Sequence, residues 1–267
     1  MSYLSASQID MFYRCGEQYR RRYIENERIP PGIAAYVGTG LHGAAEADFK
    51  SKMRTGEDMP AALLKEVAAE KYRSKMSDEG VFIPHEERTS AKQDIADGMD
   101  MTTKLIEPFL EFAKPINPAL VEHRAIIEVP EIPPILGFID LYTADKRLSD
   151  IKTGGRSWTQ DKADTATQPT VYREMVKREL GEYPERFTID CLVTTKTPKY
   201  SPVETTRRDE DFEALVAKIK VMMAAIKAGI FMPSDPTAWM CSRKFCGYYL
   251  TCPYIPAHKK TIPKSSE

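Results

Sequence analysis

The chain has 267 residues, of which 42% are hydrophobic and 29% charged, and its formal net charge is −1 at pH 7. This composition is typical of a soluble globular protein with a sizeable core, and it excludes a protein-wide basic field that would attract nucleic acid. No apolar run approaches the roughly 20 residues that span a bilayer, and the first residues lack the layout of a signal peptide, so we expect a cytoplasmic protein. Any DNA contact must come from bound cations or local patches such as Arg20–Arg22, although acidic neighbours make a solvated helix face the simpler interpretation of that run.

The N-terminal part of the chain is predicted to be helical. Ser5 can cap a first helix that carries Cys15 at its end, because apolar residues follow it at helical spacing. Glycine-rich residues 38–40 then lead into a helix that we expect to begin at Leu41. Further helices are predicted over 60–77 and 90–113.

The pattern changes after residue 115, where strand-like segments begin. Strands are expected over 120–129, 135–143 and 147–153, a helix near 166–180, strands near 186–196 and 202–206, and a helix over about 209–228. Helices followed by a meander with an inserted helix predict an α/β or α+β fold.

An acidic hairpin carries the first candidate site. Asp150 and Lys152 lie in one predicted strand, where a period of two places both side chains on the same face. If the preceding turn consists of residues 144–146, Asp140 lies opposite Asp150 with the Cβ atoms about 4.5–5.5 Å apart. Carboxylates that close repel unless a cation lies between them, and Mg²⁺ or Mn²⁺ would resolve the conflict while Lys152 orients a water molecule. The alternative is a surface hairpin whose charges face solvent.

Two pairs of residues have helical i, i+4 spacing. His42 and Glu46 form one pair, which is either a metal-binding pair or a structural histidine with a surface acid. Gln168 and Tyr172 form the other, and their side chains suit contacts to phosphate or base. The simpler interpretation of the second pair is an ordinary helix start with a half-buried tyrosine.

Four of the five cysteines form a possible ligand set: Cys15 near the N-terminus and Cys241, Cys246 and Cys252 near the C-terminus. Four thiolates suit either tetrahedral Zn²⁺ or an iron–sulfur cluster. A triplet with one distant partner, and without paired Cys-x-x-Cys knuckles, favours the iron–sulfur cluster over zinc. The fifth cysteine, Cys191, lies in a predicted strand and is expected to be a small buried hydrophobe.

These motifs, in this order, resemble the RecB-like branch of the PD-(D/E)XK nuclease superfamily that carries an iron–sulfur cluster. That branch includes the nuclease domains of bacterial AddB, CRISPR-associated RecB-like exonucleases and many phage exonucleases. The resemblance spans residues 4–252 and departs from many members in the four-residue spacing between Cys241 and Cys246, where two is common. The residues that carry it are the first helix with Cys15, Gly38–Glu46 with His42, Gly137–Asp140, Asp150–Lys152, Gln168 with Tyr172, and the closing cysteines.

The resemblance implies an α/β (α+β) restriction-endonuclease-like core, with a central mixed sheet flanked by helices. Its N- and C-terminal segments would be joined by a four-cysteine iron–sulfur cluster. We expect one RecB-like nuclease domain over 1–267, with a mostly helical part over 1–115, a catalytic core over 116–206 and a C-terminal helix and cluster-binding segment over 207–257.

The implied function is that of a metal-dependent DNA exonuclease in phage or bacterial DNA recombination, repair or processing. Its expected cofactors are one or two Mg²⁺ or Mn²⁺ ions and a 4Fe–4S cluster, and its expected partner is a DNA end, with a helicase or recombination protein as a further option. A non-catalytic DNA-binding protein that retains the nuclease scaffold is the alternative. The implied residues are Asp140, Asp150, Lys152 and Glu46 for catalysis; His42, Asp140, Asp150 and the Ile151 carbonyl for the metal; Gln168 and Tyr172 for DNA; and Cys15, Cys241, Cys246 and Cys252 for the cluster.

Overall fold

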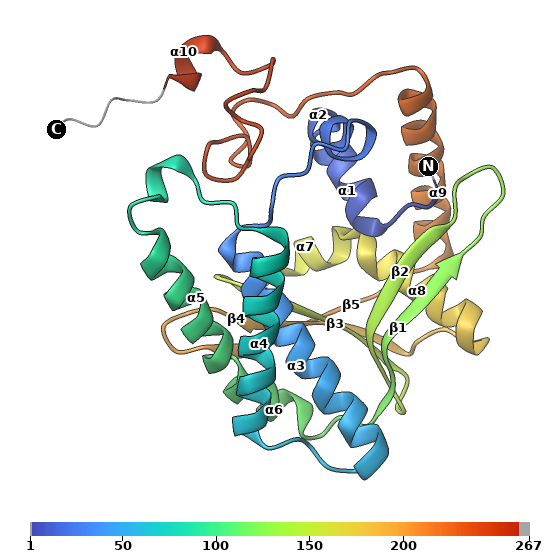
Figure 1. Ribbon diagram of the computed structural model, residues 1–267. Helices are drawn as coiled ribbons and strands as arrows, with labels where there is room; N and C mark the ends of the chain where they lie inside the picture. The colour runs from blue at the N-terminus through green and yellow to red at the C-terminus, as the bar shows by residue number, and fades with distance from the viewer. Residues whose placement is uncertain (1, 262–267) are drawn as a thin grey trace.

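The structure, a computed structural model, describes residues 2–261 and has a five-stranded mixed sheet at its centre (Figure 1). Neighbouring strands follow the chain order β1 (Pro118–Ile127), β2 (Ile135–Thr143), β3 (Arg147–Gly154), β4 (Arg186–Val193) and β5 (Lys199–Thr205). Strands β3 and β4 are parallel and the other neighbours are antiparallel. The parallel connection contains α7 (Gln160–Thr165) and α8 (Thr167–Leu180). The predicted α/β fold with a central mixed sheet flanked by helices is confirmed.

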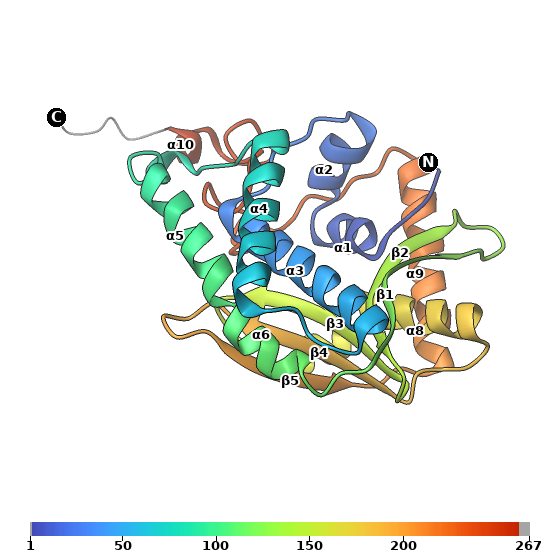
Figure 2. The same ribbon diagram turned by 60° about the horizontal axis from the view of Figure 1, so that its bottom comes forward.

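Helices cover both faces of the sheet and give the molecule three layers. On one face, α3 (Ile33–Thr55), α4 (Ala61–Glu79), α5 (Ala91–Lys104) and α6 (Ile106–Ala113) build an apolar cluster that includes Leu41, Phe109 and the strand residue Ile151. On the other face, α1 (Ala6–Arg14), α8 and α9 (Asp209–Lys227) pack side chains such as Val171 against Ile189. Figure 2 shows α3–α6 gathered together, away from α8 and α9. The hairpin of β2 and β3 therefore lies between two helical layers.

Helix α3 begins at Ile33, eight residues before the predicted start at Leu41. The glycines that were expected to precede the helix lie inside it, where they allow close packing. A Cβ atom on Gly40 would lie 2.5 Å from Thr102 Cγ2 and 2.8 Å from the Ala68 carbonyl oxygen. Because only glycine permits that approach, Gly40 allows α3 to pack closely against α4 and α5.

The single helix predicted over 90–113 is two helices, α5 and α6, separated at Leu105. Pro108 lies in the first turn of α6, where the missing N–H has no intrahelical partner to lose. In an uninterrupted helix the same proline would remove a hydrogen bond and its ring would collide with the preceding turn. The short helix α7 was not predicted.

The helical segment that follows α1 and the segment that follows α9 lie beside each other (Figure 1). After α1 the chain forms α2 (Gly16–Tyr19) and the π-helical η1 (Arg20–Ile24), and the segment after α9 returns to them. The Gly16 N–H donates to the Met232 carbonyl at 2.7 Å, and the Arg21 guanidinium donates to the Thr251 hydroxyl at 2.6 Å. The remaining short helices are η2 (His85–Glu87) and α10 (Ala257–Lys260). Within residues 2–261, no helix combines the length and apolar character needed to cross a bilayer.

Candidate active site

The β2–β3 hairpin has the register that the sequence predicted. Leu141 pairs with Ser149 and Tyr142 with Leu148, so Asp140 and Asp150 are the next opposing positions. At that point Asp140 Oδ2 accepts a hydrogen bond from the Ile151 N–H at 2.9 Å. The Asp140 carboxylate on β2 is therefore hydrogen-bonded to the backbone of β3, next to the Asp150 carboxylate.

Asp150 and Lys152 form a buried ion pair. Lys152 Nζ donates to Asp150 Oδ1 at 2.6 Å, while Asp150 is fully buried and its Oδ2 has no hydrogen-bond partner among residues 2–261. Burial raises the pKa of Asp150 to about 7; Lys152 opposes this shift and the charge of Asp140 adds to it. Burial lowers the pKa of Lys152, but the two aspartates more than offset this and the net pKa is raised. Lys152 therefore keeps its proton and acts as a cation near neutral pH.

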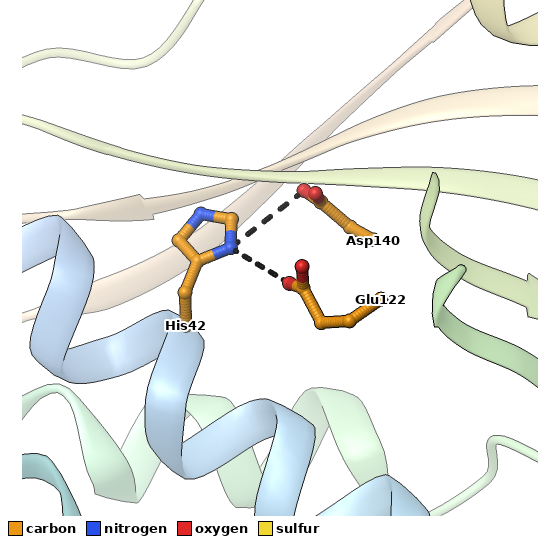
Figure 3. Close-up of side chains that lie close together, drawn as sticks. All are labelled: His42, Glu122 and Asp140. Atoms are coloured by element: carbon orange, nitrogen blue, oxygen red, sulfur yellow. Dashed lines mark ion pairs between the residues drawn. The ribbon is translucent and has the colours of Figure 1, made fainter. Parts of the chain in front are cut away.

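His42 reaches the hairpin from α3. Its Nε2 lies 2.9 Å from the Ile151 carbonyl oxygen. A carbonyl can only accept, so Nε2 carries the hydrogen and donates it. The other ring nitrogen, Nδ1, faces two carboxylates, at 3.6 Å from Glu122 Oε1 and 3.8 Å from Asp140 Oδ2 (Figure 3). Although burial lowers the pKa of His42, Glu122 and Asp140 raise it above its ordinary value.

Glu122 is a site residue that the sequence analysis did not identify. Its neighbours Val121 and His123 pair with Leu141 and Ile139, which places Glu122 opposite Asp140. Its φ is 46°, a left-handed backbone conformation that non-glycine residues seldom adopt and that occurs at functional sites. The sequence shows a glutamate in the predicted strand over 120–129. Which residue this glutamate faces depends on how that strand pairs with β2, and the sequence alone does not reveal that pairing.

The donor set fits a hard divalent cation. Ligand atoms of His42, Glu122 and Asp140 all lie within 4.8 Å of one another. The two carboxylates of this group supply the oxygen ligands that suit Mg²⁺ or Mn²⁺. The unpartnered Asp150 Oδ2 is a buried acceptor that a cation would satisfy. The Ile151 carbonyl already accepts from His42, and its second lone pair remains for a metal.

These groups line an open hollow of 610 Å³ that contains His42, Glu122, Asp140 and Lys152. Glu46 also lines this hollow, one helical turn beyond His42 on α3. Its carboxylate forms an ion pair with Lys50 Nζ at 2.6 Å and is not part of the three-residue ligand group. The structure thus brings Glu122 together with two of the predicted metal-binding residues, His42 and Asp140, whereas Asp150 lies outside this three-residue group.

Gln168 and Tyr172 lie in the first turns of α8 and interact with each other. Gln168 Nε2 donates to the Tyr172 hydroxyl at 2.6 Å. Burial and the charges of Asp140 and Asp150 raise the pKa of Tyr172, so the hydroxyl keeps its proton and can donate it. Both side chains line a second hollow, which Asp140 also borders.

Cys15, Cys241, Cys246 and Cys252 line one small cavity between the two ends of the chain. All four are free thiols, and within residues 2–261 they do not form a group whose sulfur atoms all lie within 4.8 Å of one another. Gln18 Nε2 donates to Cys246 Sγ at 3.2 Å, and the Ser234 N–H donates to Cys15 Sγ at 3.4 Å. Cys191 is 1% exposed in β4, which confirms its prediction as a buried hydrophobe.

Comparison with known proteins identifies the family of this chain, in which an acidic hairpin with a neighbouring histidine and lysine lies on a mixed sheet between helices. The family model of the PD-(D/E)XK nuclease superfamily matches residues 3–255, and the chain belongs to that superfamily.

One solved structure shares the fold at low sequence identity, and a second has a weaker similarity. One is a protein from Eubacterium rectale described as a "Putative exonuclease", with 13% identity, a TM-score of 0.56, and coverage of 90% of this chain and 87% of that one. Another, SSO0001, has 13% identity, covers 93% of this chain and 95% of its own, and has a TM-score of 0.36. No curated protein sequence matches the chain.

Proposed function

We propose that the protein is a Mg²⁺- or Mn²⁺-dependent deoxyribonuclease that hydrolyses phosphodiester bonds from a strand end. The observation that carries the proposal is the convergence of His42 Nδ1 with Glu122 and Asp140, beside the buried Asp150–Lys152 pair. Such a set of acceptors, with one buried carboxylate oxygen left without a partner, needs a cation to balance its charge.

Each residue has a role that follows from its position. His42, Glu122, Asp140, Asp150 and the Ile151 carbonyl would hold one or two ions. When bound, these ions activate water and stabilise the leaving oxygen. Lys152, which keeps its proton, orients the nucleophile and offsets negative charge that develops on the phosphate.

The remaining predicted residues border the same carboxylates. Gln168 and Tyr172 present an amide and a protonated hydroxyl to a phosphate near Asp140. Glu46 lines the first hollow but lies outside the three-residue ligand group, so it would act on water or on a second ion rather than on the first. The exonuclease mode itself rests on the family resemblance.

The test is cleavage of end-labelled oligonucleotides in Mn²⁺ by wild type, Asp150→Ala and Lys152→Ala. Each variant should lose at least about 100-fold in rate, the scale for removal of one preorganised electrostatic group. Asp145→Ala is the matched control, since Asp145 lies in the turn of the same hairpin with a side chain that is 61% exposed. Full activity in both site variants would refute the assignment. Survival of circular DNA with digestion of linear DNA would support the exonuclease mode.

A non-catalytic DNA-binding protein is the second candidate function, because a site that binds DNA need not cleave it. It predicts DNA binding without cleavage in Mg²⁺ or Mn²⁺. Calorimetric titration with Mn²⁺ separates the two: an active site should bind ions in wild type and lose them in Asp140→Ala.

The four cysteines are proposed to hold a 4Fe–4S cluster that joins the two ends of the chain. Their shared cavity and the two hydrogen bonds donated to sulfur suit thiolate ligands. Anaerobically purified protein should be brown and contain iron and sulfide, and Cys246→Ser should lose both while Cys191→Ser retains them. Colourless protein that contains zinc would favour the zinc alternative. A cytoplasmic location, a helicase or recombination partner and the one-domain organisation over 1–267 remain predictions.

A further inference from the structure

A second hollow adjoins the metal-binding hollow at Asp140. Its volume is 480 Å³, and its walls come from the N-terminal segment, η1, β2 and the first turns of α8. Asp140 borders both hollows, so both open onto the same carboxylate. If a polymer is cut at Asp140, the second hollow can therefore hold the units of the polymer that flank the cleaved bond.

Two aromatic side chains on the wall of this hollow are unusually exposed. Phe138 is 46% exposed and Tyr3 is 43% exposed, and both line the hollow. Phe138 is two residues before Asp140 on β2, and both side chains border this hollow. Aromatic faces left open to solvent beside a reactive carboxylate are suited to stacking on the bases of an unpaired strand.

The same hollow carries positive charge that no ion pair of the described residues neutralises. Arg22 and Arg28 line it, and neither forms an ion pair with an acid among residues 2–261. The adjacent Arg20 and Arg21, by contrast, are both held in ion pairs by Glu17. Two arginines without an acidic partner among the described residues can bind phosphates, and the exposed aromatic rings beside them can stack on the bases of the same strand.

The acids that border the hollow do not cancel this charge. Asp140 belongs to the metal site, and Asp10 accepts a hydrogen bond from the Thr167 hydroxyl at 2.5 Å. On the first hollow, Lys71 and Lys75 lie on α4 opposite the hairpin. Cationic side chains therefore border the hollows on both sides of Asp140, as a continuous phosphate backbone requires.

We infer that the second hollow is a subsite for unpaired nucleotides, in which Phe138 and Tyr3 stack on bases and Arg22 and Arg28 contact phosphates. Stacking needs an open base face, which a base pair inside a duplex does not offer. The subsite thus selects single-stranded DNA, separately from the ion-binding residues that perform the chemistry. The inference rests on the proposed function for the identity of the polymer.

The test measures binding of a labelled single-stranded oligonucleotide and of the matching duplex by fluorescence anisotropy, in chelator so that no cleavage occurs. Phe138→Ala should weaken single-strand binding about 5- to 140-fold, the range for loss of one stacked base, and should change duplex binding much less. Phe138→Trp should restore it, because the larger ring stacks at least as well. Leu180→Ala is the control, since Leu180 is 42% exposed at the end of α8, outside both hollows.

The contribution of the two arginines is tested by the salt dependence of single-strand binding. The double variant Arg22→Ala/Arg28→Ala should reduce the slope of log K against log salt by about 1.4 for a single strand, at roughly 0.7 per phosphate contact. Arg54→Ala, an exposed arginine at the end of α3, should leave that slope unchanged.

The outcomes distinguish this inference from the proposed function. Unchanged single-strand binding in Phe138→Ala, or an equal loss on duplex, would overturn the subsite even if the protein cleaves DNA in Mn²⁺. Selective single-strand binding that depends on Phe138, without cleavage by the wild type, would leave the subsite standing and refute the nuclease assignment. Circular dichroism of each variant verifies the fold, and recovery in Phe138→Trp excludes a folding defect as the cause.

Discussion

The buried carboxyl of Asp150 predicts an unusual pH dependence of stability for the ion-free protein. Its pKa is raised from 3.8 to about 7, first by burial and then by the charge of Asp140, with Lys152 acting in the opposite direction. The native state therefore binds this proton more tightly than the unfolded chain does. Stability should fall as pH rises from about 4 to about 7, by about 4 kcal/mol in total from this group at 1.36 kcal/mol per pH unit.

A bound divalent ion should reverse this trend, because it binds the ionised carboxylates and competes with the proton. Ion-dependent stabilisation should increase with pH over the same interval, reaching about 2.7 kcal/mol at an ion concentration 100 times the dissociation constant. The assay is urea unfolding followed by circular dichroism between about pH 5 and pH 7.5, with chelator or with Mn²⁺. Asp150→Asn removes the titrating group, so its ion-free stability should vary much less with pH.

His42 contributes in the same direction, since its pKa is also raised and its stabilisation is lost as pH rises through its native value. His42→Gln, alone and combined with Asp150→Asn, separates the two groups, because the carboxyl acts at lower pH than the imidazole. If wild type and Asp150→Asn lost equal stability per pH unit in chelator, the reasoning about the buried carboxyl would be refuted.

Three further predictions follow from particular contacts. Glu122→Gln should raise the Mn²⁺ concentration for half-maximal cleavage at least about 10-fold, because it removes a charged ligand, as metal titration of activity would show. Gly40→Ala should lower the free energy of unfolding by about 1–3 kcal/mol in urea titration, since the new methyl group collides with neighbouring helices. Arg147→Met should cost about 3–5 kcal/mol in the same assay, because it removes the charged partner of the fully buried Asp190.

Each of these predictions has a matched control. Glu46→Gln should shift the Mn²⁺ requirement less than Glu122→Gln, and the opposite order would make Glu46 the direct ligand. Gly155→Ala should be tolerated, because nothing lies within 4 Å of its new Cβ atom. Arg186→Met should cost no more than about 1 kcal/mol, since it breaks an exposed pair with Asp145. Equal costs for the two arginine variants would contradict the burial argument.

Much of the active-site hairpin could be predicted from local pattern. The period of two places Asp150 and Lys152 on one face, and a three-residue turn sets the pairing of Asp140 with Asp150; the structure has that register. The local pattern predicts the helix that carries His42 but places its start at Leu41, after Gly38 and Gly40. Gly40 lies against α4 and α5, and Gly38 lies against Thr153 of β3, and no local pattern reveals these close contacts.

The fold class is determined by the local sequence, because strand and helix periods repeat over a few residues and depend on neighbours along the chain. The family follows from the order of the active-site motifs along the sequence, which resembles that of the superfamily. The tertiary structure alone decides that Glu122 meets Asp140 and His42, and that Phe138, Tyr3, Arg22 and Arg28 share one hollow. These contacts join residues that are far apart in the chain. They depend on how α3, η1 and β1 pack around the hairpin, and that packing is decided by the burial of the whole core.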